Sequence, residues 1–193
     1  MSLIGRVFEM RFRNSPDGYG AIPQALHWLT VGLVVLAWAT GEFDDALPKG
    51  AARATGLLVH ESAGLAILGI LVVRLLWRLA DPPPPPEPTV LGKWLDRAGL
   101  LAHYALYALL IAAPVADIVL QFARGEPLQL FGLFEIASPW TANRPFARAT
   151  KEVHEVLANG LVVFAGVHAA AALVHHWFFR DRTLVRMLPG STR

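Results

Sequence analysis

Four long apolar runs organise the chain, and polar or proline-rich segments separate them. The runs cover about residues 25–43, 56–79, 100–122 and 153–179. A helix needs about 20 apolar residues to cross a bilayer, and these runs are of that length. Segments such as LAILGILVV lack the polar stripe, repeating every 3.6 residues, of a helix in a soluble bundle. The pattern predicts an all-α protein: a single-domain, integral membrane four-helix bundle.

The connections between the runs carry the charges that set the expected orientation. Of the 17 Lys and Arg residues, eleven lie on the side of the N-terminus and six on the opposite side. Because Lys and Arg are enriched in cytoplasmic loops, both termini are predicted to be cytoplasmic. The basic sequence pI of about 9.3 reflects this topology first and does not indicate nucleic-acid binding. The first run lacks a small-x-small cleavage site, so we expect a retained span rather than a signal peptide.

Two of the connections between the apolar runs have an unusual amino-acid composition. Residues 82–86 are all proline, which favours an extended polyproline II segment between the second and third spans. The outer loop of about 30 residues between the third and fourth spans contains the apolar piece LQLFGLF. We expect this loop to fold over the membrane surface as a cap.

Histidine and cysteine usage indicates the kind of chemistry. The chain has no Cys, which excludes disulfides, thiolate metal sites and covalent attachment of haem through C-x-x-C-H. An ionisable residue inside a span is costly and by default indicates function, and every predicted span contains His. Several histidines that converge in a bundle interior indicate a cofactor or metal. The seven are His27, His60, His103, His154, His168, His175 and His176.

The spacing on the fourth span indicates two sites at different depths. His154 and His168 are 14 residues apart, about 21 Å along a helix, and point within about 40° of the same direction. By depth, His60 pairs with His154 near the outer side, and His27 pairs with His168 near the inner side. Each pair could supply the two axial ligands of one haem iron.

Zinc or iron transport is the competing use of such histidines. It favours carboxylates beside the histidines at mid-depth. Glu61 and Glu155 lie instead at the outer edge, each beside an outer histidine.

The remaining polar residues of the inner side allow two interpretations each. His103 and His175 are either interfacial polar residues or hydrogen-bonding partners of a quinone head group. His176 points away from the face of His168 and is expected at the level of the lipid head groups. Arg74 and Arg78, near the inner end of the second span, either neutralise haem propionates or extend to the aqueous interface.

Several segments carry a family resemblance over about residues 25–189. They are ALHWLT, LLVHESAG, VVRLLWRL, AHYALYALLIAAPV, VHEVLANG, GVHAAAALVHHWF and RDRTLVRMLP. These segments resemble the prokaryotic cytochrome b561 family of four-helix, di-haem cytochromes of the bacterial inner (cytoplasmic) membrane. The resemblance implies two haem b groups, ligated by His27, His60, His154 and His168. It also implies quinone contacts by His103 and His175.

The resemblance further implies a reaction, the transfer of electrons from superoxide on the outer side to ubiquinone. Lys151 matches a basic position near the outer haem. Together with Arg144 and Arg148 it is expected to attract the superoxide anion, because a positive surface raises the local concentration of anions. The alternative is a cytochrome b subunit that accepts electrons from a partner dehydrogenase or hydrogenase through the outer loop.

Overall fold

Four long helices make up most of the molecule. The computed structural model describes residues 11–87 and 92–189 of the 193-residue chain. The helices are α1 (Ala21–Glu42), α2 (Ala51–Ala80), α3 (Lys93–Ala123) and α4 (Arg144–Val174). All four are long and apolar enough to cross a membrane. Each predicted span therefore lies within one helix of its own, apart from a few residues at the ends.

Two helices begin well before the predicted spans. α3 starts seven residues early, and α4 starts at Arg144 rather than near residue 153. At α4 the side chain of Asn143 accepts a hydrogen bond from the backbone N–H of Phe146, and a proline occupies the first turn. Both features favour a helix start, whereas hydropathy detects only the apolar part of a helix. The connection between α3 and α4 is consequently shorter than the predicted 30 residues.

That connection also contains the only strands in the described part of the chain, where the sequence predicted none. Strands β1 (Leu128–Leu130) and β2 (Phe134–Ile136) pair antiparallel through a turn at Phe131 and Gly132. Both residues have positive φ, within a three-residue connection between the paired residues Leu130 and Phe134. Strand β1 packs against α2 and α3 at one end of the molecule.

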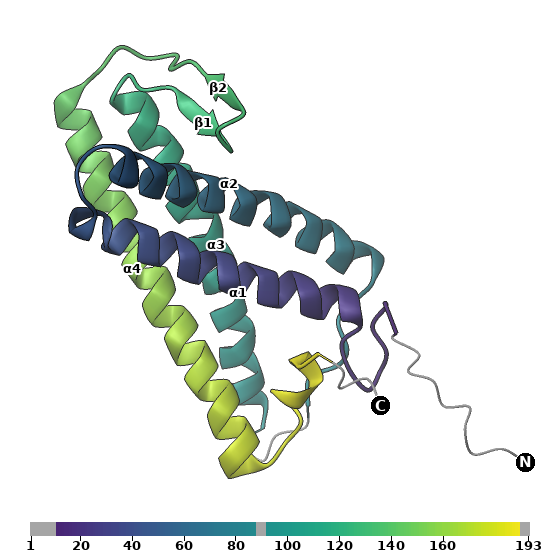
Figure 1. Cartoon of the computed structure of the whole chain (residues 1–193). Coiled ribbons are helices and arrows are strands. Elements are labelled where there is room, and N and C mark those ends of the chain that lie inside the picture. The colour runs from purple at the N-terminus through teal and green to yellow at the C-terminus, as the bar shows by residue number, and fades with distance from the viewer. Residues whose placement is uncertain (1–10, 88–91, 190–193) are drawn as a thin grey trace, which may run out of the picture.

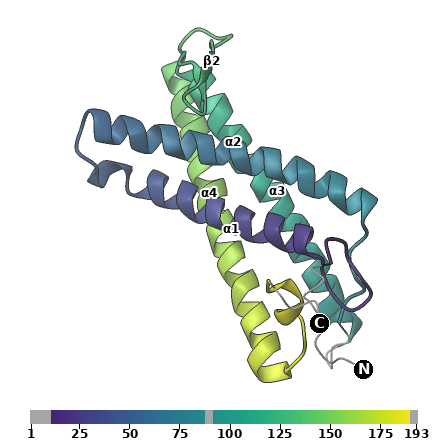
Figure 2. The ribbon, with the colours of Figure 1, turned by 45° about the vertical axis from the view of Figure 1, so that its right-hand side comes forward.

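The helices form two antiparallel pairs. α1 packs along α2, and α3 packs along α4, while contact between the two pairs is much less extensive. We call α1 and α2 the first helical pair, and α3 and α4 the second helical pair. The two pairs cross each other, as both views show (Figures 1 and 2).

Burial follows the pattern of a protein in lipid. Large apolar side chains point outward on every helix, for example Val35 at 58%, Leu76 at 61% and Val163 at 63% exposure. The buried set, by contrast, includes several polar residues. They are Gln24, Thr30, Asp81, Gln121, Thr150 and Arg186. Polar side chains inside the molecule, beneath an apolar surface, are expected where the surrounding solvent is hydrocarbon.

One end of the molecule is closed by contacts between three distant segments, which we call the latch: residues 11–20, 81–87 and 180–189. The latch segment 180–189 contains the short helix η3 (Val185–Met187). Arg186 donates to the carbonyl of Pro85 at 3.0 Å and pairs with Glu87 at 3.3 Å. The backbone N–H of Asn14 donates to Asp81 Oδ2 at 2.9 Å. The opposite end, the loop end, comprises residues 43–50, with the short helix η1 (Asp44–Ala46), and residues 124–143.

Candidate functional site

Positions that face neighbouring helices recur every seven residues on all four helices, although two of them, Gly41 and His103, are exposed. Seven residues advance a helix by about 10.5 Å and return the side chain to within about 20° of its direction. The repeat therefore stacks side chains in layers. From the loop end towards the latch, the positions are Gly41, Val34 and His27 on α1; His60, Ile67 and Arg74 on α2; Asp117, Leu110 and His103 on α3; and His154, Leu161 and His168 on α4.

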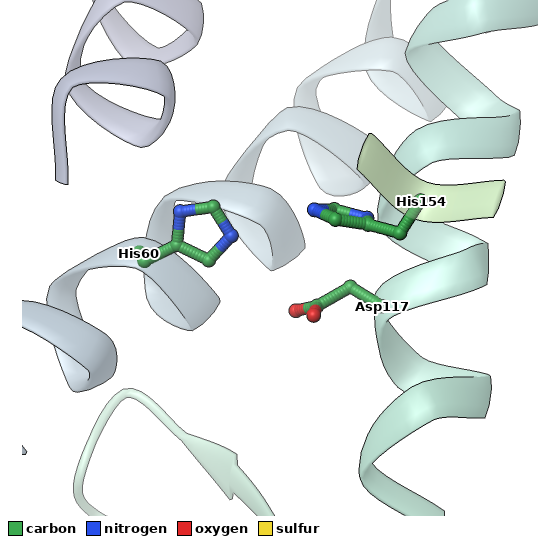
Figure 3. Close-up of side chains that lie close together, drawn as sticks. All are labelled: His60, Asp117 and His154. Carbon is green, nitrogen blue, oxygen red and sulfur yellow. The ribbon is translucent and has the colours of Figure 1, made fainter. Parts of the chain in front are cut away.

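The first of these, the loop-side layer, contains two histidines that face each other. The rings of His60 and His154 have their centres 5.9 Å apart and are inclined by 79° (Figure 3). His60 Nδ1 donates to the carbonyl of Ala37 at 2.8 Å, and His154 Nδ1 donates to that of Ala113 at 2.9 Å. A carbonyl on Nδ1 fixes the ring and leaves Nε2 as the metal-binding nitrogen.

Gly41 allows the close approach of α1 to His60. A Cβ atom at this position would lie 2.8 Å from a ring carbon of His60, which is too close for any side chain. The position of the imidazole therefore depends on a glycine of the neighbouring helix.

Asp117 completes the loop-side layer and was not among the residues predicted from the sequence. One ligand atom from each of His60, Asp117 and His154 lies within 4.8 Å of the other two (Figure 3). Two signals were available: Asp117 is the only acidic residue in the predicted span 100–122, and it follows His103 by 14 residues. Near this layer, buried Gln121 donates a hydrogen bond to the carboxylate of Glu61.

An apolar layer separates the two groups of polar side chains. Ile67, Leu110 and Leu161 are buried together, and Val34 packs against them. Leu161 lies midway along α4 between His154 and His168. The layer therefore keeps two polar sites apart within the apolar interior.

The latch-side layer contains further residues predicted from the sequence, of which His103 is exposed and His27, Arg74 and His168 are partly buried. The rings of His103 and His168 are in contact, with centres 5.2 Å apart. His27 lies near His168 and Arg74. Arg74 donates to the hydroxyl of Thr30 at 3.1 Å. The layer thus brings together His27 and His168, as the depth argument expected, but the ring that touches His168 is that of His103.

Three residues singled out from the sequence lie nearer the latch. His175 begins a short π-helical segment, η2 (His175–Phe179), and contacts Asp181. His176, on the same segment, lies beside Trp177. Arg78 is exposed near the end of α2.

The three basic residues predicted to attract superoxide lie on the first two turns of α4 rather than in a loop. Arg144 lines a surface hollow of about 380 Å³ together with Arg124 and Glu126. Lys151 pairs with Glu155 at 3.1 Å, and Arg148 is exposed. All three are therefore at the loop end and reachable from solvent.

The two imidazoles of the loop-side layer would suit a haem iron, which histidine nitrogens ligate. Their ring centres lie 5.9 Å apart, and the two rings come from different helical pairs. A mainly helical protein with spanning helices and facing histidines has the arrangement expected of a membrane cytochrome.

Comparison with known proteins identifies the family within this class. Residues 18–190 match the family described as prokaryotic cytochrome b561, and the chain belongs to that family. Cytochromes of this family bind haem b and transfer electrons in the membrane, so the predicted family and multi-pass location are confirmed.

Curated relatives cover nearly the whole chain. It is 35% identical over 175 residues to a probable superoxide oxidase CybB of Yersinia pestis, which covers 89% of this chain and 96% of the relative. It is 34% identical over 191 residues to cytochrome b561 homolog 2 of Escherichia coli K12, with 95% and 97% covered. A second relative there, cytochrome b561 homolog 1, is 34% identical over 172 residues, with 85% and 93% covered.

Proposed function

We propose that this cytochrome takes electrons from superoxide at its loop end and passes them to ubiquinone near its latch. The observation that carries the proposal is the facing pair His60 and His154, held between the two helical pairs beneath a basic helix start. The choice of superoxide follows from the likeness to a probable superoxide oxidase. The latch then faces the cytoplasm and the loop end faces outward across the bacterial inner membrane.

Two haem b groups would occupy the two polar layers. His60 and His154 would hold one group, and His27 and His168 the other. Haem supplies one-electron storage and transfer, while the protein supplies ligation, burial and charge. The apolar layer excludes water between the layers, and Arg74 would pair with a propionate of the latch-side haem, with Arg78 nearer the water.

The charges at the loop end suit an anionic substrate. Superoxide carries one negative charge, and Arg144, Arg148 and Lys151 are exposed there. A positive surface raises the encounter rate of an anion and loses this effect at high salt. In the full reaction two superoxide anions lose one electron each to become oxygen, and one ubiquinone takes both electrons and two protons.

The decisive experiment uses the purified, haem-loaded protein. A steady supply of superoxide is expected to reduce the haems, with ubiquinone reduced at half the molar rate of superoxide oxidation. Superoxide dismutase, added as a control, should abolish both signals. If superoxide leaves the haem spectrum oxidised, the proposed donor is wrong.

A second candidate is a relay subunit fed by a partner dehydrogenase or hydrogenase. Exposed apolar side chains on the connection between α3 and α4 favour it: Leu133 is 75% exposed and Phe134 is 70% exposed. Such a cytochrome would remain oxidised with superoxide and would be reduced only when its redox partner is present.

A further inference from the structure

The seven-residue spacing of polar side chains on α4 continues past the two proposed haem sites to His175. His175 follows His168 by seven residues, so it lies on the same face about 10.5 Å nearer the latch. Here the helix changes to the π-helical segment η2, and Arg180 adopts a left-handed conformation with φ 53°. The chain reverses at this point and brings Asp181 back to His175. Single-turn π segments are rare and occur often at functional sites.

His175 and Asp181 form a short and partly enclosed pair. His175 Nδ1 lies 2.5 Å from Asp181 Oδ2, and the two side chains are 14% and 12% exposed. The other carboxylate oxygen accepts from the backbone N–H of Thr183 at 2.9 Å. Both oxygens of Asp181 are therefore engaged, which fixes the carboxylate and, through it, the imidazole ring.

The surroundings of Asp181 favour its charged form. Burial alone would raise the pKa of Asp181, but the hydrogen bonds from His175 and Thr183 outweigh it and hold the pKa below its usual range. The group is thus a carboxylate, which accepts the Nδ1 proton and compensates the charge of a protonated imidazole. Among the residues that the structure describes, no hydrogen bond reaches His175 Nε2.

The surroundings allow a lipid-soluble molecule to reach the pair. Trp177 and Phe178 follow His175 by two and three residues and are 70% and 84% exposed. Large apolar side chains at the end of a spanning helix lie in lipid or at its interface. A quinone arriving from the bilayer would therefore meet His175 beside the latch-side layer.

We propose that Asp181 is a positioning residue for quinone reduction, which holds His175 so that its Nε2–H donates a proton to a quinone carbonyl oxygen. The inference rests on the proposed function. The quinone takes two electrons, one from each of two superoxide anions, and two protons to become the quinol. One proton comes from His175 Nε2 and is replaced from the aqueous phase, and the other oxygen takes its proton from water at the interface.

The test separates proton delivery from electron entry. The haems of the purified, haem-loaded protein are reduced chemically with dithionite, excess reductant is removed, and decylubiquinone is added. In Asp181→Asn, reoxidation is expected to slow about tenfold or more, since a positioned acid contributes about 10²–10⁴-fold. The KM for quinone and the haem content should stay unchanged, and the solvent deuterium isotope effect should rise. Asp181→Glu should restore part of the rate.

Asp17→Asn is the matched control, because it removes an exposed carboxylate at the same end of the molecule. Equal reoxidation rates and isotope effects in Asp181→Asn and the unaltered protein would overturn the role of Asp181, while the proposed function would stand. Slow reoxidation in Asp181→Asn, together with failure of superoxide to reduce the haems, would support the role of the His175–Asp181 pair. It would overturn superoxide as the electron donor. If decylubiquinone does not reoxidise the unaltered protein, ubiquinone is not the electron acceptor, and the role proposed for His175 and Asp181 is wrong as well.

Discussion

Asp117 places a negative charge beside the two imidazoles of the loop-side layer. Its carboxylate lies within 4.8 Å of a nitrogen of His60 and of His154. A negative charge so close to an iron site stabilises the oxidised, more positive form. At this separation one unit charge changes the energy by about 1–3 kcal/mol, using effective dielectric constants between those of protein and water.

Asp117→Asn is therefore expected to raise the reduction potential of the loop-side haem by roughly 40–130 mV, the same energy expressed for one electron. Spectroelectrochemical titration measures the change. The latch-side haem should keep its potential, which provides an internal control. An unchanged pair of potentials would show that Asp117 does not act on either haem.

Gly41 offers a second test of the same layer. Gly41→Ala would bring a methyl group against the ring of His60 and displace it, so the protein is expected to lose most of one haem and retain the other. Gly32→Ala is the matched control, because Gly32 lies on the same helix and a Cβ there meets no atom within 4 Å. Pyridine haemochrome analysis gives the haem content of each variant. Full occupancy in Gly41→Ala would count against His60 as a ligand.

For single residues, the sequence predicts which side chains are functional more readily than which side chains are in contact. The histidines were found because imidazole inside an apolar run is conspicuous. Asp117 was not among the predicted residues, although it is the only acidic residue in its apolar run. The partner of His175 lies beyond a chain reversal at Arg180, a non-glycine residue with positive φ, which no local pattern indicates.

Among the elements, the latch depends on one buried guanidinium. Arg186 is 6% exposed and connects the proline segment to the last turn of the described chain through Pro85 and Glu87. Removing one partner of a buried ion pair leaves the other uncompensated, which costs about 3–5 kcal/mol.

Arg186→Gln should accordingly lower the free energy of unfolding in detergent by about 3 kcal/mol. Arg182→Gln, at an exposed position on the same segment, serves as the control and should change it little. Denaturant titration followed by circular dichroism gives both values. Equal stability of the two variants would mean that the latch contributes little to the fold.

The predicted helices agree with the structure over their apolar segments, which hydropathy detects. All four spans were predicted from apolar length. The helix starts at Lys93 and Arg144 were missed because capping and polar first turns extend a helix into water. The β-hairpin was missed because three-residue strands leave little periodicity in the sequence.

For the molecule as a whole, the orientation in the membrane is open to a direct test. The chain has no Cys, so single cysteines can be introduced without a labelling background. Thr141→Cys at the loop end should react with a membrane-impermeant maleimide on intact cells. Asp17→Cys in the latch should react only after the membrane is opened, because both positions are exposed but on opposite sides. The reverse pattern would place the loop end in the cytoplasm.

The crossing of the two helical pairs has a consequence for how this protein is made. Each proposed ligand pair takes one histidine from the first helical pair and one from the second, where the protein itself makes few contacts. Bound haem iron would then link the two helical pairs. We expect newly synthesised chains to remain open to membrane proteases until both cofactors are bound, so the supply of haem in the cell would govern how much of this protein accumulates.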